Sequence, residues 1–395
     1  MSLVESIWWS RAQGLGPRLL APPLAAAEAV FRAAVAVRGA LYDRGLLVSA
    51  RVAAPVISVG NLAVGGAGKT PAALAIAARL LGRGLRVALL SRGYGASRRD
   101  ARVVSDGARL LLGAPEAGDE PALVARRLPG LAVLCGPRRA DLARTAIGEL
   151  GVDVLLLDDG FQHRALARDL DVVVLDAADA FGNGRLLPAG PNREPRAALR
   201  RAGLVWLSRV DGAEPAALER LRALALEVTG RAAVESRHAP VEVLDGRLER
   251  GLGLGALRGA RAYLLAGIAR PEGFRRTAAA LGAEVAGESW FPDHHPFTEA
   301  ELRETLAAAE RARCEVVVTT EKDAVRLPPE VAGDGRLRVV RIDAAVVAGE
   351  QVLEEALEEA VGGWRSRIGG SNPTPTSTPT PNPNPNPNPN RAGRS

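Results

Sequence analysis

A glycine-rich loop that ends in lysine and threonine is the first group of residues that could carry out chemistry. An apolar run at 56–59 leads into G-N-L-A-V-G-G-A-G-K-T at 60–70, and an alanine-rich helical pattern follows. In such loops the backbone N–H groups converge on phosphate oxygens at a helix N-terminus, the lysine reaches the β- and γ-phosphates, and the hydroxyl ligates Mg²⁺. The alternative is a structural glycine turn, and the usual first glycine is replaced by Ala63. We predict a nucleotide site formed by Ala63, Val64, Gly65, Gly66, Ala67, Gly68, Lys69 and Thr70.

Two adjacent carboxylates give a second candidate group. The apolar run at 154–157 ends in Asp158 and Asp159, and G-F-Q-H follows at 160–163. A strand of this kind delivers carboxylates to the carboxyl edge of a parallel sheet, where they can hold Mg²⁺ beside bound phosphates. We therefore predict a metal site made by Thr70, Asp158 and Asp159, with Gln162 and His163 beside it. An aspartate at a strand end also occurs without any metal.

Further polar groups follow predicted strands or lie in loops. They are S-R-G-Y-G at 91–95, with Arg92 and Tyr94, G-D-E at 118–120, with Asp119, and G-P-R-R at 136–139, with Arg139. Each of them alone could be a turn or a solvated arginine. The segment F-P-D-H-H-P-F at 291–297 holds two of the four histidines, but no cysteine or third histidine stands at metal-ligand spacing. We expect general acid–base or orienting work from this pair.

Lysine is rare in this chain, which has 51 basic residues and only Lys69 and Lys322 as lysines. Arginine serves wherever a planar guanidinium is adequate, so the two lysines mark positions that need a compact ammonium on a flexible stem. The sequence assigns no role to Lys322.

These groups need a scaffold that brings strand ends together. From Pro55 onward, short apolar runs alternate with helical patterns, which is typical of βαβ units and a mainly parallel sheet. The runs predicted as strands are 56–59, 87–90, 131–135, 152–157, 172–175, 204–207, 262–265, 316–319 and 337–342. We expect an α/β protein, with a P-loop-type α/β/α sandwich and a second, smaller α/β domain. The expected division is 1–50 for a membrane-associating helical segment, 51–190 for the nucleotide-binding core, 191–368 for the second domain and 369–395 for a disordered Pro/Asn/Thr-rich tail.

Composition excludes several classes of protein. With 47% hydrophobic residues the chain can bury large cores, and two cysteines cannot form a disulfide framework. The net charge is +6, but aromatic residues make up only 4% and no basic stripe is interleaved with them, so we do not expect nucleic-acid binding. No run of 18 uncharged apolar residues occurs, and no membrane-spanning helix is expected. The stretch 23–42 is amphipathic and basic, and it predicts either a helix packed on its own domain or one lying on an anionic membrane.

Taken together, these motifs resemble the tetraacyldisaccharide 4′-kinases of lipid A biosynthesis. The motifs that carry the resemblance are V-G-N-L-A-V-G-G-A-G-K-T-P (59–71), S-R-G-Y-G (91–95), G-D-E-P (118–121), D-D-G-F-Q-H (158–163), L-L-P-A-G-P-N-R-E-P (186–195), A-G-I-A-R-P-E-G-F (266–274), F-P-D-H-H-P-F (291–297) and T-E-K-D-A-V (320–325). One departure is Asn192, where an apolar residue is expected.

The resemblance implies transfer of the γ-phosphate of ATP to the 4′-hydroxyl of a tetraacyldisaccharide 1-phosphate, with Mg²⁺, at the cytoplasmic face of the bacterial inner membrane. It implies Asp119 as the base, paired with His294 and supported by Lys69. It adds Arg92, Tyr94, Arg139, Gln162, His163, Arg193 and Glu194 as contacts to substrate or nucleotide. Because Asp119 and His294 belong to different halves, the site is expected between them. No obligate protein partner is implied.

Two other functions are compatible with a P-loop. A membrane-associated regulatory ATPase of the deviant Walker-A type has a loop K-G-G-x-G-K-T, but Val64 stands where its signature lysine would be. A GTP-dependent metallochaperone needs [NT]-K-x-D for guanine, and the order T-E-K-D at 320–323 differs. The regulatory ATPase also gives no role to D-D-G-F-Q-H or D-H-H.

Overall fold

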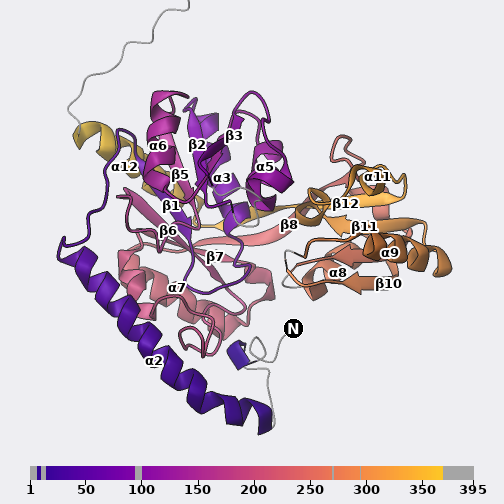
Figure 1. Ribbon diagram of the computed structural model, residues 1–395, viewed down its shortest axis with the longest axis horizontal. Helices are drawn as coiled ribbons and strands as arrows, with labels where there is room; N and C mark the ends of the chain where they lie inside the picture. Colours follow the sequence, from indigo (N-terminus) through magenta and orange to yellow (C-terminus); the bar gives the residue numbers. More distant parts are fainter. Residues whose placement is uncertain (1–6, 10–14, 94–99, 269–270, 294, 368–395) are drawn as a thin grey trace, which may run out of the picture.

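The computed structural model describes residues 7–9, 15–93, 100–268, 271–293 and 295–367. One continuous 12-stranded sheet organises the fold, in the order β10-β9-β11-β12-β8-β7-β6-β1-β5-β2-β4-β3. It extends through a larger lobe and a smaller lobe, which lie side by side in Figure 1. The mainly parallel α/β architecture expected from the sequence is confirmed.

Among the described residues the larger lobe contains seven strands, and β1 lies between β5 and β6, both parallel to it. Its strands are β1 (Val56–Gly60), β2 (Val87–Ser91), β3 (Arg102–Asp106), β4 (Ala132–Cys135), β5 (Val154–Asp158), β6 (Leu170–Asp176) and β7 (Leu204–Ser208). Only the edge strand β3 pairs antiparallel here. This order places the carboxyl ends of β1 and β5 next to each other, where open parallel sheets bind ligands.

Helices cover both faces of this part of the sheet. The apolar sides of α3 (Lys69–Gly82), α5 (Asp119–Arg127) and α12 (Glu350–Arg367) share one core with the strands. On the opposite face, α6 (Arg139–Gly148) packs on β1, β2, β4 and β5, and α7 (Pro215–Thr229) packs on β6 and β7. The short helix α4 (Ala114–Ala117) directly precedes α5. The result is the α/β/α sandwich that a buried parallel sheet requires.

Two long strands connect the lobes. β8 (Val234–Asp245) begins beside β7 and β12 (Leu337–Ala348) begins beside β11, and the two pair antiparallel from Arg338↔Asp245 to Ala348↔Glu235. In Figure 1 this ribbon runs from the larger lobe into the smaller one. The chain then returns to the larger lobe as α12.

The smaller lobe is a second α/β unit. It contains β9 (Arg261–Ala266), β10 (Glu284–Trp290) and β11 (Val316–Thr320), with α8 (Pro271–Ala280), α9 (Glu299–Arg311), α10 (Glu321–Ala324) and α11 (Pro329–Ala332). Phe274 of α8 and Leu302 of α9 belong to separate cores on the two faces of these strands. The predicted boundary near residue 190 does not coincide with a break in the sheet, since β7 pairs with β6. The division into domains stays a prediction.

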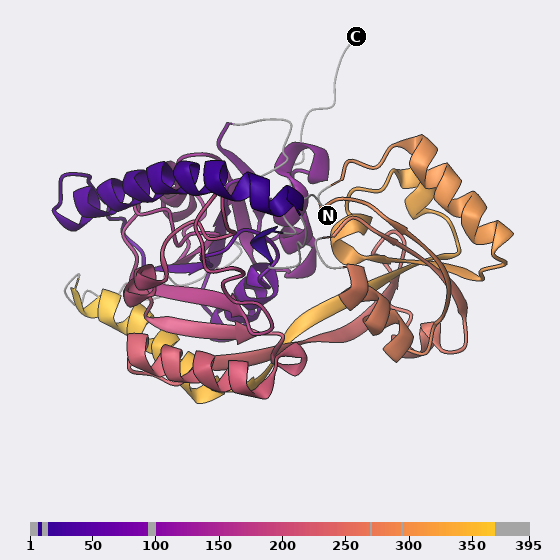
Figure 2. The same cartoon turned by 90° about the horizontal axis from the view of Figure 1, so that it is seen from below.

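A long N-terminal helix, α2 (Leu15–Asp43), lies along the outside of the larger lobe (Figures 1 and 2). Its segment Leu19–Asp43 has a mean hydropathy of 1.5, and only 6% of the apolar window is buried. By length and composition it could cross a membrane, which corrects the expectation of no such helix. The sequence of α2 contains no uncharged run of 18 residues, because single charged residues interrupt a helix that is otherwise rich in alanine and valine.

Candidate active site

The nucleotide loop lies at the carboxyl end of β1, as its sequence context predicts. Gly68 has φ 84 and directly precedes α3, and no side chain caps this helix N-terminus. A positive φ strains any residue with a Cβ, so the sharp turn into the helix requires glycine here. The first N–H groups of the helix thus remain available to an anion, with the positive end of the helix dipole behind them.

Lys69 lies between two acceptors from different loops. Its Nζ is 3.2 Å from Asn61 Oδ1 and 3.5 Å from Asp159 Oδ1. Arg193 donates to both oxygens of Asp159, at 2.7 and 2.8 Å, and also to the side chain of Asn61. Burial by itself would raise the pKa of Asp159, but Lys69 and Arg193 together hold it well below its usual range. Three loops therefore meet around one ionised carboxylate.

Asp158, at the end of β5, has the opposite electrostatic surroundings. The residue is 4% exposed, and burial together with the charges of Glu120 and Asp159 raises its pKa to about 7, against the opposing effect of Lys69 and Arg139. The influence of Glu120 also indicates that the first turn of α5 lies near this carboxylate. An added cation would relieve the crowding of negative charge.

Arg139, at the start of α6, is a buried cation that interacts with the charges of Asp158 and Asp159. It is 2% exposed, and its Nε and Nη1 atoms are buried and donate no hydrogen bond to the described residues. Burial and the neighbouring Arg92 lower its pKa to about 10, so the guanidinium stays charged at neutral pH. A buried guanidinium with free donors fits a phosphate oxygen.

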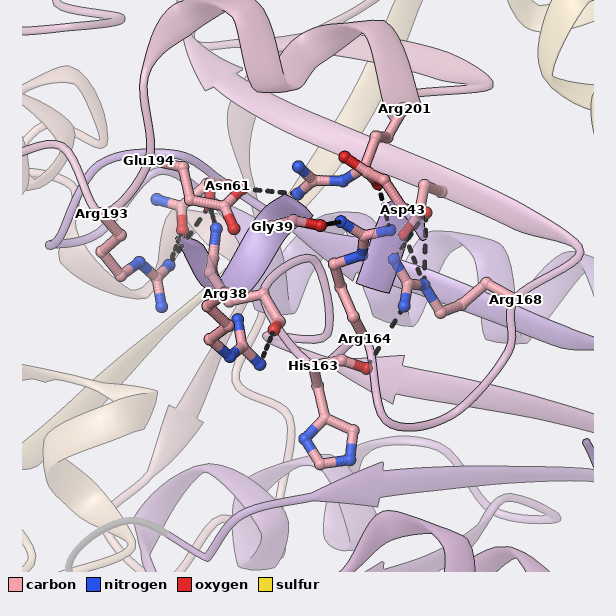
Figure 3. A network of polar contacts seen from close by, with 12 residues as sticks. Arg38, Gly39, Asp43, Asn61, His163, Arg164, Arg168, Arg193, Glu194 and Arg201 are labelled. Carbon is pink, nitrogen blue, oxygen red and sulfur yellow. Dashed lines mark hydrogen bonds and ion pairs between the residues drawn. The ribbon is translucent and has the colours of Figure 1, made fainter. Parts of the chain in front are cut away.

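His163 is neutral at physiological pH. Burial, followed by the charges of Arg139 and Arg92, lowers its pKa to about 4. In Figure 3 its imidazole points away from Arg164 and Arg168. A neutral imidazole with one donor and one acceptor nitrogen suits recognition of a hydroxyl group.

The loop that contains Arg193 braces the nucleotide loop through its backbone. Val64 N–H donates to Pro191 O at 2.8 Å, and Arg193 N–H donates to Leu62 O at 2.8 Å. Asn192, the one departure from the family pattern, donates through Nδ2 to Phe181 O at 2.8 Å and to Arg185 O at 2.9 Å. The polar residue therefore stabilises the turn of its own loop.

The remaining predicted contacts in this region fall into two groups. Gln162 donates through Nε2 to Asn61 O at 3.0 Å, so it stands beside Lys69 and Arg193. Glu194 is 6% exposed and forms an ion pair with Arg201, whose guanidinium lies 4.4 Å from the centre of the Phe161 ring. Glu194 thus contacts Arg201 at the edge of the site, whereas Gln162 lies next to Lys69 and Arg193 through Asn61.

Three residues around the nucleotide loop were not predicted. Ser208 Oγ donates to Ala67 O at 2.7 Å, and Arg209 donates to Gly66 O at 2.6 Å while pairing with Asp176. A Cβ on Gly68 would stand 3.0 Å from His238 Nε2. The rarity of histidine, with four in the chain, is the only signal in the sequence that singles out His238.

The proposed base is placed at the junction of the lobes. Asp119 is the first residue of α5, and its Oδ2 lies 3.4 Å from Nε of Arg326 in the smaller lobe. His294 and Tyr94 lie outside the described residues. His295 bonds through Nε2 to both carboxylate oxygens of Glu301 at 3.0 Å and stacks on Phe291. The side chain of His295 is thus already engaged within its own lobe.

The donor set at the carboxyl ends of β1 and β5 suits Mg²⁺. Within the described ranges no cluster of three or more His, Cys, Asp and Glu side chains could hold a metal ion alone. P-loop enzymes instead use one hydroxyl, one carboxylate and the oxygens of the nucleotide. Thr70 and Asp158 would supply these two groups, and burial together with the charges of Glu120 and Asp159 raises the pKa of Asp158 in spite of Lys69 and Arg139.

The N-terminal helix α2 forms hydrogen bonds and ion pairs with two of these loops. At one end Arg38 donates to Gln162 O at 3.0 Å, and Arg164 donates to Gly39 O at 3.2 Å and pairs with Asp43 at 2.7 Å (Figure 3). Nearer its N-terminus, Glu28 contacts the loop that contains Arg193. Residues of a surface helix are thus linked to groups around Lys69 through short contacts.

This arrangement suits transfer of a phosphoryl group. A helix N-terminus, Lys69 and Arg139 supply positive charge for phosphate groups, and Lys69 and Arg139 both act on the carboxylate pair Asp158 and Asp159. Asp119 lies on the side of α5 that faces the second lobe, so an acceptor held between the lobes could reach it.

Comparison with known proteins agrees with this geometry. The family model of tetraacyldisaccharide-1-P 4′-kinase matches residues 20–362. A tetraacyldisaccharide 4′-kinase of Anaeromyxobacter sp. (strain Fw109-5) is 70% identical over 361 residues, covering 91% of this chain and 97% of that protein. The enzyme of Syntrophus aciditrophicus is 43% identical and covers 80% and 87%. The crystal structure of LpxK from Aquifex aeolicus in complex with ATP superposes with a TM-score of 0.70 at 30% identity, covering 87% of this chain and 99% of that one.

Proposed function

The chain belongs to the tetraacyldisaccharide-1-P 4′-kinase family, and on that basis we propose which residues carry each part of the reaction. It is an ATP-dependent kinase that transfers the γ-phosphate of ATP to the 4′-hydroxyl of a tetraacyldisaccharide 1-phosphate, giving the 1,4′-bisphosphate. This membership sets aside the regulatory-ATPase and metallochaperone alternatives.

The nucleotide phosphates are held by residues 63–70. The backbone of the loop and the N-terminus of α3 bind the phosphate oxygens, and Lys69 reaches the β- and γ-phosphates. Lys69 lies within 3.5 Å of Asn61 and Asp159, so its ammonium is already placed at the end of the loop. When Lys69 turns to the phosphates, Arg193 still neutralises the carboxylate of Asp159.

Thr70, Asp158 and Asp159 would hold Mg²⁺, with Asp158 the principal carboxylate. A bound Mg²⁺ would supply positive charge against the negative charge that develops on the phosphates during transfer. Arg139 would add a buried positive charge, and its Nε and Nη1 atoms could donate to a phosphate oxygen.

Asp119 takes the proton of the 4′-hydroxyl as the oxygen attacks the γ-phosphorus and the bond to ADP breaks. A sugar hydroxyl is a weak acid, so a positioned carboxylate is needed at this step. We propose His294 as the partner of Asp119 in this step, on the resemblance and because His295 is engaged with Glu301. Arg92, Tyr94, Gln162 and His163 are proposed contacts to the sugar or to phosphate.

The enzyme acts on a lipid, and α2 is proposed to carry it to the membrane surface, at the cytoplasmic face of the bacterial inner membrane. The outward side of this helix exposes Leu19, Val30 and Val37, at 75%, 73% and 59%. Apolar side chains on a basic helix insert into the interface between headgroups and acyl chains. We propose no nucleic-acid contact and no obligate protein partner.

The observation that carries this assignment is the placement of Lys69 and Asp159 at the end of the nucleotide loop, with Asp119 at the junction of the lobes. The test follows label from γ-labelled ATP into tetraacyldisaccharide 1-phosphate in detergent micelles, with Mg²⁺ and after its removal by chelation. We expect label in the lipid for the wild type, and its loss with Mg²⁺ removed and with Lys69→Ala. Transfer that persists in Lys69→Ala would refute the role of the lysine.

A further inference from the structure

The segment from Thr320 to Arg326 contains the motif T-E-K-D, to which the reaction so far assigns no role. It follows β11, and Thr320 caps α10 by accepting the N–H of Asp323 at 3.2 Å. Asp323 is fully buried, accepts from Thr320 Oγ1 at 2.7 Å and from Gly267 N–H at 3.2 Å, and pairs with Arg326. The carboxylate of Asp323 therefore joins the two ends of the segment and links it to Gly267.

Arg326 joins this turn to the larger lobe. Its Nε lies 3.4 Å from Asp119 Oδ2, and the two side chains are only 8% and 17% exposed. Its Nη1 donates to His295 O at 2.9 Å, and its guanidinium lies 5.1 Å from the centre of the Phe297 ring. One planar group thus contacts Asp119 and the D-H-H segment together.

Lys322 holds the other side of the D-H-H segment. Its Nζ lies 2.9 Å from Asp293 Oδ1, and both side chains are partly buried. Lys322 and Arg326 are four residues apart, and they contact Asp293 and His295, the neighbours of position 294 in the sequence. Lys322, the second of the two lysines, therefore contacts the same D-H-H segment (293–295) as Arg326 does.

Glu321 connects the turn to the far end of α5. Its carboxylate pairs with Arg127 at 3.0 Å and with Arg341 of β12 at 2.6 Å. Arg127 is the last residue of the helix that Asp119 begins, and it also donates to Ile342 O at 2.6 Å. Both ends of α5 are therefore fixed to one short segment of the smaller lobe.

We propose that Arg326 is a positioning residue for Asp119, and that it sets the orientation of the carboxylate from the opposite lobe. The inference rests on the proposed role of Asp119 as base. The positive charge of Arg326 attracts Oδ2 of Asp119 toward the smaller lobe, and this attraction favours one orientation of the carboxylate. Orientation of a base within a fraction of an ångström matters because misplacement by about 1 Å can cost about 100-fold in rate.

The test is a double-mutant cycle on kcat at saturating lipid and ATP, using the wild type, Asp119→Asn, Arg326→Gln and the double variant. If Arg326 acts through Asp119, Arg326→Gln lowers kcat about 10- to 100-fold in the wild type and causes almost no further loss beside Asp119→Asn. The affinity for ATP stays unchanged in every variant. Losses that multiply in the double variant would overturn the inference.

The fold itself needs a separate control, because Arg326→Gln leaves Asp323 without its cation. Arg326→Lys keeps a positive charge beside Asp323 but lacks the planar fork, so we expect a near-normal melting temperature and a several-fold lower kcat. That loss must also vanish beside Asp119→Asn, and a loss of equal size there contradicts the proposal. The matched control is Arg303→Gln on α9, an exposed arginine paired with Glu299. If Asp119→Asn alone keeps the wild-type kcat, the proposed base is wrong, an outcome distinct from a failed cycle.

Discussion

The carboxylate of Glu28, on the outer helix α2, accepts the backbone N–H of Leu186 at 3.0 Å. It also accepts from Arg185 at 2.7 Å and Arg32 at 2.6 Å, while the residue is only 4% exposed. Burial opposes its ionisation, but the Leu186 N–H and the two guanidinium groups outweigh burial and lower its pKa. Since residues 185–193 brace the nucleotide loop, Glu28 links the apolar helix to the site.

We expect Glu28→Gln to weaken this link. Loss of the charge leaves Arg185 without its partner and weakens the bond to Leu186, which should lower the free energy of unfolding by about 1–3 kcal/mol. Thermal melting followed by circular dichroism measures the change. Glu304→Gln, an exposed glutamate paired with Arg311 on α9, is the control. Equal melting temperatures for the two variants would show that Glu28 does not anchor α2.

The raised pKa of Asp158 makes the stability of the ligand-free protein depend on pH. Its carboxyl has a pKa of about 7 in the folded chain, against an ordinary value of 3.8, so the folded state binds more protons between these values. Stability is therefore fully present below about pH 4 and falls as the pH rises to about 7. Asp158→Asn removes this penalty, and we expect its free energy of unfolding at pH 8 to exceed that of the wild type by at least on the order of 1 kcal/mol.

Melting curves at several pH values, without nucleotide or Mg²⁺, measure this effect. The control is Asp141→Asn, since Asp141 lies on the exposed side of α6 and its side chain is 42% accessible. Asp158→Asn should also abolish phosphoryl transfer. A variant no more stable than the wild type at pH 8 would show that Asp158 is not under electrostatic strain.

His163 should remain neutral throughout the working range of the enzyme. Its pKa of about 4, set first by burial and then by Arg139, lies below the ordinary value of 6.5. The stability that depends on this neutral imidazole is present above pH 6.5 and is lost as the pH falls toward 4. NMR of the imidazole ¹⁵N nuclei reports the titration directly, with His163→Gln used for assignment. A midpoint near 6.5 would contradict the buried, cationic surroundings described here.

The outward face of α2 should bind membranes. We expect Val30→Asp and Val37→Asp to reduce co-sedimentation with vesicles that contain anionic lipid, because each places a charge where an apolar side chain would insert. ATP binding in solution should be unchanged. Leu226→Asp is the matched control, since Leu226 is an exposed leucine, at 57%, on α7. Equal loss of vesicle binding in the control would assign the effect to general surface charge.

The parts of the fold that could be predicted are those with local signals. Helix α9 has such a signal, because Thr298 and Glu301 form a capping box that marks its start. The buried strands β1, β2 and β5 appear as short apolar runs between glycine-containing turns. Strand β8 was missed, since its residues are mostly half-exposed and include Pro240, so neither an apolar run nor a clean alternation marks it.

The residues of the site also divide into those with a local sequence signal and those without one. The nucleotide loop and the carboxylate pair carry their own motifs, and both lie at neighbouring strand ends as expected. Ser208 and His238 could not be recognised, because each lies against a residue more than 100 positions away and has no distinctive neighbours in the sequence. Arg326 directly follows the motif T-E-K-D-A-V, but the motif does not show that its partner is Asp119, which is also more than 100 positions away. Contacts of this kind depend on the order of strands in the sheet, which local patterns do not specify.

The most direct test of the central claim is a single-turnover measurement of phosphoryl transfer by Asp119→Asn. Enzyme loaded with γ-labelled ATP and Mg²⁺ is mixed with tetraacyldisaccharide 1-phosphate and quenched at short times. If Asp119 removes the proton of the hydroxyl, the rate of the chemical step falls by about 100-fold or more while ATP affinity is retained. A chemical step as fast as that of the wild type would show that another group accepts the proton and would contradict the account.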